Sequence, residues 1–223
     1  MRVRRPGSWF LGREPRVKAN NVPGERQEEG QAMPITRVQE LFARELGEIY
    51  DAEHRFLEGQ QEMVERATDE ELQRAIRNHI LQTQQHIGNL EQVFRELGQE
   101  PRRETNEVAR GLASEAQESL KETQGEAPLG DALRDCAINA AVAKVEHFEM
   151  ASYRSMLPGA RRMGETEIAN LLEANLRQEE NAAQIAERSA EELFQKALTA
   201  EEMDGGGLID KAIGKVKDRL TGQ

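Results

Sequence analysis

The chain has 223 residues, 4% of them aromatic and 32% charged, and its formal net charge is −11 at pH 7. This length fits one domain with tails, and the wealth of Ala, Glu, Gln, Leu and Arg predicts an all-α fold. The acidic balance argues against general nucleic-acid binding, because a phosphate backbone repels an acidic surface. Cys136 is the only cysteine, which excludes an intramolecular disulfide and a cysteine-based zinc cluster. Since the sequence also has no apolar run of about 20 residues, we expect a soluble protein of the reducing cytoplasmic compartment.

Residues 1–32 differ in composition from the rest of the chain. Prolines interrupt them at Pro6, Pro15 and Pro23, and they carry a net charge of +3 against −14 for the remainder. Because they also lack helical periodicity, they are predicted to form a disordered tail. Met33 stands directly before the first periodic segment, so we expect translation to start there.

Two helices are predicted next. Apolar residues recur at helical spacing after Thr36, a candidate N-cap, and predict a helix over about 35–67. Thr68 and Glu71 have the spacing of a capping box, which predicts a second helix over about 68–97. The short turn between the two helices requires an antiparallel hairpin.

A long connection and a second helix pair follow. The connection of about 30 residues is longer than a hairpin needs, and it carries a short amphipathic helix over about 105–123. Helices are predicted over about 131–157 and 165–198, with a break at Pro158-Gly159. Two hairpins joined by one long crossover give residues 33–200 the connectivity of a ferritin-like four-helix bundle.

Residues 201–223 combine a glycine linker, Gly205 to Gly207, with a predicted basic amphipathic helix. Apolar residues from Leu208 to Leu220 fall on one face of this helix, and lysines with Arg219 fall on the other. Such a helix can bind an anionic membrane surface or a protein partner. Packing against its own bundle is the alternative.

Polar residues interrupt the apolar stripes of all four long helices. They lie in register with the core or beside it: Glu53, His79, Gln82, His86, Glu146, Glu149 and Glu179. A buried carboxylate without a partner is so costly that it takes up a proton or a cation. Several that converge on one layer therefore predict a metal site, and oxygen and imidazole ligands suit iron or manganese. Glu146 and Glu149, one helical turn apart, have the spacing needed to bridge two metals.

These residues also have plain structural interpretations. Glutamate pairs three residues apart are common on solvated helices, and a neighbouring helix can satisfy a core histidine. Three further glutamates lie nearer the helix flanks and are interpreted as solvated or as outer contacts of the ligands: Glu45, Glu48 and Glu180. Tyr50 and Tyr153 are candidate hydrogen-bond donors to ligand carboxylates.

The same segments resemble a known family. From about Val38 to Phe194 the chain is similar to the YciE/YciF stress-protein family of ferritin-like domains, and neither tail takes part. Four segments in order carry the resemblance: Leu41-Phe42-x-x-Glu45-Leu46-x-x-Ile49-Tyr50-Asp51-Ala52-Glu53, His79-x-x-Gln82-Thr83-x-x-His86, Lys144-Val145-Glu146-His147-Phe148-Glu149-x-Ala151-Ser152-Tyr153, and Leu171-Leu172-Glu173 with Glu179.

The resemblance implies a dimeric, dimetal ferritin-like domain that belongs to bacterial stress responses. Carried over by position, it implies five metal ligands and two weaker candidates, Gln82 and His86; the five are Glu53, His79, Glu146, Glu149 and Glu179. Gln82 and Gln178 depart from the family pattern, because acidic residues are usual there. Ala182 stands where a Glu-x-x-His pair would place its histidine. Fewer carboxylates predict weaker binding of the second metal.

Three functions are compatible with these patterns. The first is a homodimeric protein with a dinuclear iron centre, or one of iron and manganese, that oxidises Fe(II) with oxygen or peroxide. The second is a non-enzymatic scaffold or dimerisation module, whose inward polar groups satisfy one another and whose tail binds a membrane or partner. The third is a cage-forming storage ferritin, although nothing in the sequence indicates a large hollow assembly.

Overall fold

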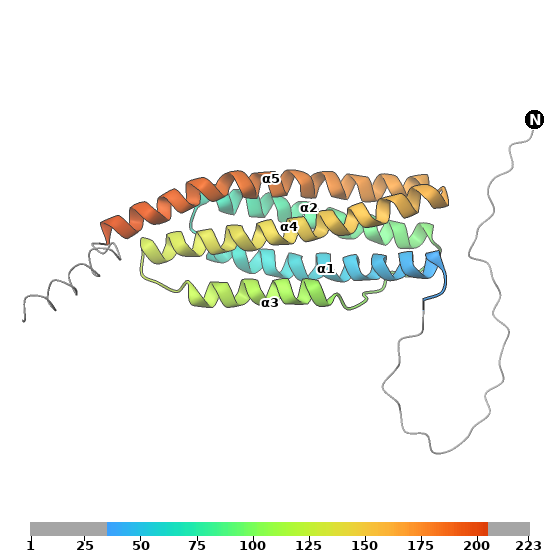
Figure 1. The fold of residues 1–223 in the computed structure, drawn as a ribbon, viewed down its shortest axis with the longest axis horizontal. Helices are drawn as coiled ribbons and strands as arrows, with labels where there is room; N and C mark the ends of the chain where they lie inside the picture. The colour runs from blue at the N-terminus through green and yellow to red at the C-terminus, as the bar shows by residue number, and fades with distance from the viewer. Residues whose placement is uncertain (1–34, 205–223) are drawn as a thin grey trace, which may run out of the picture.

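Five α-helices make up the part of the chain that the structure, a computed structural model, describes, which is residues 35–204 (Figure 1). They are α1 (Val38–Arg66), α2 (Glu70–Glu96), α3 (Glu107–Glu122), α4 (Leu129–Met163) and α5 (Thr166–Met203). No strand occurs within residues 35–204, so the predicted all-α class is confirmed. The predicted tail over 1–32 and the helix predicted after the glycine linker lie outside the described residues.

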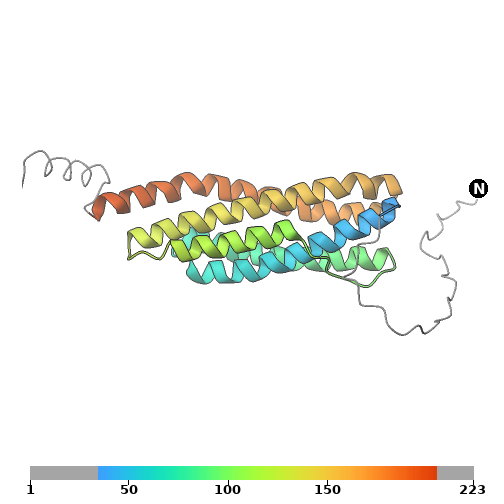
Figure 2. The same ribbon diagram turned by 60° about the horizontal axis from the view of Figure 1, so that its bottom comes forward.

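Four of the helices form an elongated bundle, and α3 covers part of its outside. The neighbours of α1 in the bundle are α2 and α4, and α5 packs against the same two helices. The crossover helix α3 lies over α1 and α4, as Figure 2 shows. This arrangement confirms the predicted connectivity of two hairpins and one long crossover. Among the described helices, none combines the length and the apolar character needed to cross a bilayer.

The core consists of two apolar clusters with a polar layer between them. One cluster fills the end of the bundle where α1 begins and includes Leu46, Phe94 and Leu172. The other fills the opposite end and includes Ile76 and Leu193. Between them the buried side chains are mainly polar: Glu53, Gln60, His79, Thr83, His86, Asn139, Glu146, Glu149 and Glu179. The apolar clusters hold the four helices together, so the polar layer is fixed in place from both sides.

The turn between α1 and α2 differs from the predicted capping box. Asp69, not Thr68, is the N-cap of α2, because its carboxylate accepts hydrogen bonds from the backbone N–H groups of Glu71 and Leu72 at 3.0 and 2.9 Å. The Thr68 hydroxyl instead donates to buried Asp135 on α4, at 2.6 Å. At the start of α1 the N-cap position is Arg37, so the Thr36 prediction is also wrong. A tertiary contact thus overrides a local capping pattern.

The predicted break at Pro158-Gly159 is wrong as well. Helix α4 continues through both residues and ends at Gly164, whose positive φ of 81° suits a residue without a side chain. Pro158 removes one backbone hydrogen bond, but it faces solvent, where water can satisfy the freed carbonyl group. A Cβ added to Gly159 would lie 3.4 Å from a ring carbon of Phe42. Gly159 thus faces Phe42 of α1, and a methyl group there would make an ordinary van der Waals contact.

The other helix boundaries agree with the predictions to within a turn or so. The crossover helix spans Glu107–Glu122, and α5 runs on to Met203 rather than ending near residue 198. Two apolar residues of the predicted helices are exposed: Leu41 is 46% exposed and Val108 is 58% exposed. Both lie near the beginning of their helices, where fewer neighbouring side chains cover them.

Candidate metal centre

Six side chains from four helices meet in the polar layer. Helix α1 contributes Glu53, α5 contributes Glu179, and the other four come in pairs from α2 and α4: His79 with His86, and Glu146 with Glu149. His79 is 5% exposed and the other five are at most 1% exposed. The two histidines are seven residues apart, which is about two turns, so their rings project from the same face of α2. Their ring centroids lie 6.2 Å apart.

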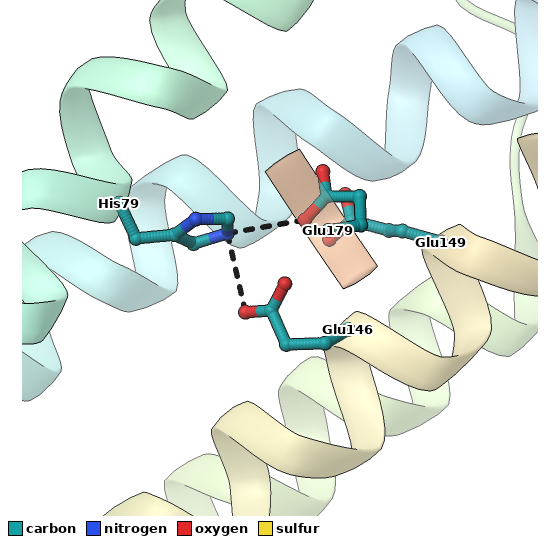
Figure 3. Close-up of side chains that lie close together, drawn as sticks. All are labelled: His79, Glu146, Glu149 and Glu179. Carbon is teal, nitrogen blue, oxygen red and sulfur yellow. Dashed lines mark ion pairs between the residues drawn. The ribbon is translucent and has the colours of Figure 1, made fainter. Parts of the chain in front are cut away.

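The six side chains form two groups with one shared member. In the first group, His79, Glu146, Glu149 and Glu179 each bring one ligand atom within 4.8 Å of the others. In the second group, Glu53, His86 and Glu179 do the same. Figure 3 shows the side chains of the first group pointing toward one another from α2, α4 and α5. Glu179 belongs to both groups, so its carboxylate lies between them.

Each histidine directs one ring nitrogen at two carboxylates. His79 Nε2 lies 3.1 Å from Glu146 Oε1 and 3.4 Å from Glu179 Oε2. His86 Nδ1 lies 2.7 Å from Glu179 Oε1 and 3.4 Å from Glu53 Oε1. The two imidazoles thus face the shared carboxylate from separate positions along α2.

The other ring nitrogen of each histidine meets a glutamine. His79 Nδ1 lies 3.0 Å from Gln82 Oε1, and His86 Nε2 lies 2.7 Å from Gln178 Oε1. An amide oxygen can only accept a hydrogen bond, so each outer nitrogen carries a proton. In a neutral ring the inner nitrogen then presents its lone pair to the carboxylates, as a metal ligand does.

The cluster leaves an unusual number of polar atoms without hydrogen-bond partners. Over residues 35–204 there are nine buried side-chain nitrogen and oxygen atoms of this kind, and all nine belong to these six residues. They include both carboxylate oxygens of Glu146, Glu149 and Glu179. Since buried polar groups in native proteins nearly always have partners, this concentration is typical of a site that could hold a positive ion.

The pKa values of the cluster residues also indicate that positive charge stabilises the cluster. Burial and the negative charge of Glu53 raise the pKa of Glu146 to about 7, and burial with the neighbouring carboxylates raises the pKa values of Glu149 and Glu179. Burial by itself would lower the pKa of His86, but the facing carboxylates of Glu53 and Glu179 outweigh it and raise this pKa to about 11. Without a cation, the cluster therefore retains protons that exposed groups would release.

A second layer of contacts holds Glu53. The hydroxyl of buried Tyr153 donates to Glu53 Oε1, and the Asn175 side-chain amide donates to the Tyr153 oxygen at 3.0 Å. Asn89 in turn donates to Asn175 Oδ1 at 2.7 Å. Tyr153 thus donates a hydrogen bond to a cluster carboxylate, as predicted. Tyr50 does not, because its hydroxyl donates to Glu91 outside the cluster at 3.1 Å.

The flanking glutamates lie outside the cluster, as their positions on the helices predict. Glu48 pairs with Arg44 at 2.7 Å, and Glu180 pairs with Arg154 at 2.8 Å. Glu45 is partly exposed. The sequence did not reveal the role of Gln178, because it lies one position before Glu179 and no spacing connects it with His86, 92 residues earlier. Asn175 was detectable, since it is a polar residue in the apolar stripe of α5.

Comparisons with known proteins place this architecture in a family. A family model described as a domain of unknown function, DUF892, matches residues 37–199. Protein YciF of Escherichia coli strain K12 is 29% identical over 154 residues, which cover 69% of this chain and 89% of YciF. The crystal structure of the E. coli stress protein YciF has a TM-score of 0.66 at 26% identity, and the match covers 73% of this chain and 99% of that one. The structure of YcfI from Rhodopseudomonas palustris has the same TM-score at 30% identity, with 71% of this chain and 98% of that one covered. The resemblance seen in the sequence is therefore confirmed, and the chain belongs to the YciE/YciF family, whose domain is described as DUF892.

Proposed function

We propose that this protein binds two divalent cations in the polar layer, with iron as the natural metal and manganese as the alternative. The single observation that supports the proposal is the set of nine partnerless buried atoms on six side chains. Four carboxylates carry a formal charge of −4, and two neutral imidazoles add nothing. Two divalent cations would balance this charge, which removes the cost of burying it.

The donor set supports the choice of metal. Oxygen and imidazole nitrogen suit iron and manganese, whereas the cluster has no thiolate to favour a softer metal. Four glutamates and two histidines are also the donors of dimetal carboxylate bundles. Here both histidines come from α2. The cluster keeps four carboxylates although positions 82 and 178 are glutamines. We propose that Gln82 positions His79 and that Gln178 positions His86.

Each Fe(II) ion bound here would give up one electron to oxygen or peroxide. The chain's own residues have three tasks in that reaction. Glu179, which belongs to both groups of ligand atoms, would help to hold the ions. Gln82 and Gln178 would keep the inner lone pairs of the histidines available, and Tyr153 would fix the orientation of Glu53. The apolar clusters on both sides would limit the access of bulk water. Removal of Fe(II) or peroxide fits the description of the relative YciF as a stress protein.

Anaerobic loading with Fe(II) tests the proposal. We expect about two irons per chain after removal of unbound metal, followed by oxygen or peroxide consumption when either oxidant is added. A parallel titration with Mn(II) compares the two metals. If neither metal is retained, the proposal is wrong and the non-enzymatic scaffold becomes the better interpretation.

A matched pair of double variants assigns the iron to this cluster. Glu146→Ala with Glu149→Ala should abolish iron binding, because it removes two of the four carboxylates. Glu115→Ala with Glu118→Ala removes two exposed glutamates at the same spacing on α3 and should retain about two irons. Equal iron content in both double variants would place the metal elsewhere.

We also propose a homodimer, as the family resemblance implies. Sedimentation of the full chain should give the mass of two chains. A much larger mass would favour the cage-forming ferritin instead.

A further inference from the structure

A cavity of about 360 Å³ lies between α1, α3 and α4, beside the polar layer. Its volume falls within the range of small-molecule sites. Apolar side chains from all three helices form most of its walls: Phe56, Met63, Leu112, Leu120, Val142 and Val145. The crossover helix α3 supplies the outer wall, so the cavity exists only because the connection crosses the α1–α4 groove at this point.

The cavity leads from the surface to the candidate metal centre. Exposed Glu58 and Gln117 lie at its outer part, while Glu146 at its inner part is 1% exposed. Both carboxylate oxygens of Glu146 lack a hydrogen-bond partner. Small residues keep the space open: a Cβ added to Gly59 would meet no atom within 4 Å, and Ala113 faces the cavity from α3. A molecule in this cavity can therefore reach a buried carboxylate whose Oε1 lies 3.1 Å from His79 Nε2 and whose Oε2 has no hydrogen-bond partner.

The charges around the cavity disfavour an anion. Arg55 is paired with Asp51 at 2.6 Å, and Arg110 is paired with Glu107 at 2.5 Å. Neither partner belongs to the lining, whereas Glu58, Glu62 and Glu146 do. An anionic ligand would face these carboxylates without a free cation to offset them, and the apolar walls would not compensate a bare charge.

We propose that this cavity binds a neutral organic molecule with an apolar body and one hydroxyl-bearing end, and that this end donates a hydrogen bond to Glu146. The place of the ligand next to two metal ions rests on the proposed function, but the binding itself does not. The cavity would thereby hold an organic ligand next to the proposed metal centre.

Binding of 1-octanol to the full chain tests the proposal. Ligand-observed NMR titrations would be made on the metal-free protein and on the iron-loaded protein, with octanoate at pH 8 as the charged comparison. We expect saturable binding of octanol in both forms, and at least tenfold weaker binding of octanoate. Octanol that shows no saturable binding, or octanoate that binds as tightly, would overturn the proposal.

Glycine variants locate the binding site. Gly59→Leu fills the cavity from the α1 wall and should weaken octanol binding at least tenfold. Gly88→Leu is the matched control, because a Cβ there also meets no atom within 4 Å and Gly88 does not line the cavity. Both replace a helical glycine, so both should fold and melt at a higher temperature. Ala113→Leu fills the cavity from the opposite wall and should repeat the effect of Gly59→Leu.

The octanol-binding result can be interpreted separately from the iron content of the variants. All three variants should still bind about two irons per chain, because none touches the six cluster residues. If octanol binds to Gly59→Leu and Ala113→Leu as it does to the unmodified chain, the cavity is not the site and the proposal fails. A chain that binds octanol but no iron would refute the metal centre alone.

Discussion

Asp51 and Glu149 are two carboxylates with nearly the same burial and opposite electrostatic surroundings. Asp51 is 3% exposed and Glu149 is 1% exposed. Two arginines contact Asp51, Arg55 at 2.6 Å and Arg103 at 2.8 Å, and the Asn106 backbone N–H donates to it at 3.0 Å. Neither oxygen of Glu149 has a hydrogen-bond partner.

The pKa values of the two residues move in opposite directions. Burial opposes ionisation of Asp51, but its three donors outweigh burial and hold its pKa below the ordinary value. Burial and the facing glutamates raise the pKa of Glu149 well above its ordinary value. Burial of a carboxylate therefore does not reveal its role. A carboxylate with internal partners stabilises the fold, whereas a group of carboxylates without them requires an external cation.

The largest expected effect is a loss of stability of the metal-free protein as the pH rises. The pKa of Glu146, raised to about 7, and that of His86, raised to about 11, lie above the ordinary values of 4.5 and 6.5. The folded chain thus holds protons that the unfolded chain releases, so this stability is complete below the unfolded values and is lost as the pH rises toward the folded ones. Glu146 contributes over about two pH units in this range and His86 over about one and a half, so at about 1.4 kcal/mol per pH unit for each group we expect a loss of roughly 4 to 5 kcal/mol between pH 5 and 8.

Urea unfolding of chelator-treated protein at several pH values measures this loss. Loading with Fe(II) or Mn(II) at pH 8 should restore the stability, because the cations replace the protons. The pKa of Asp51 is lowered, so its contribution to stability is present above about 3.8 and is lost only as the pH falls through the pKa of the folded state, which lies below that value. Equal stability of the metal-free protein at pH 5 and 8 would contradict the prediction.

Asp51→Ala should destabilise the protein by about 2 kcal/mol, because it leaves the buried Asn106 N–H and two arginines without their acceptor. Urea unfolding would measure the change, and the iron content should stay at about two per chain. Glu48→Ala removes a partly exposed carboxylate from the same helix and should cost less than about 1 kcal/mol. A loss of iron from Asp51→Ala would contradict this separation, because it would show that Asp51 also supports the metal-binding cluster.

Glu149→Leu should have the opposite sign. In the metal-free protein at pH 8 this substitution replaces a carboxyl group without partners by an apolar side chain of similar size. The free energy of unfolding should therefore rise by about 1.5 kcal/mol. The same variant should lose iron. Glu118→Leu, at an exposed position on α3, should change stability by less than about 0.5 kcal/mol. Destabilisation by Glu149→Leu would mean that Glu149 has internal partners after all.

The smallest effect is expected at Gln178. Gln178→Leu removes the acceptor that fixes His86 Nε2, so iron affinity should fall about tenfold, or about 1.4 kcal/mol, while the saturating amount stays at two per chain. Competition with a chelator would measure the affinity, and NMR of the imidazole nitrogens would report the tautomer. Gln85→Leu, at the exposed neighbour that contacts Gln178, is the control. Unchanged affinity in Gln178→Leu would remove the positioning role.

Much of the architecture could be predicted because it is encoded in local periodicity. The register of Glu53, Glu146, Glu149 and Glu179 with apolar neighbours places them in the interior, and the heptad spacing of His79 and His86 places both on one helix face. The short turn and the long crossover then determine which helices are neighbours. These features together predicted that the six side chains would meet, with His86 as a weaker candidate; Gln82, the other weaker candidate, contacts His79 instead.

Apart from the N-cap of α1, the features that sequence reasoning missed depend on contacts between distant residues or on the packing of the helices. Thr68 is recruited by Asp135, 67 positions away, and a local capping rule cannot anticipate that contact. The Asp51–Arg103 pair depends on the path of the crossover, which no periodicity describes. The continuation of α4 through Pro158 depends on the solvent-facing side of the helix, which becomes known only once the packing is known.

The crossover helix α3 has a separate consequence. It is joined to the bundle mainly through one face, and Asn106 at its beginning caps it while also contacting α1. Detachment of α3 would expose the cavity without separating any of the four bundle helices, so the amides of α3 should exchange with deuterium well before those of α1 and α4. We therefore expect the outer wall of the cavity to open at a lower free energy than the four-helix bundle, so that a bulky molecule can enter without unfolding the core.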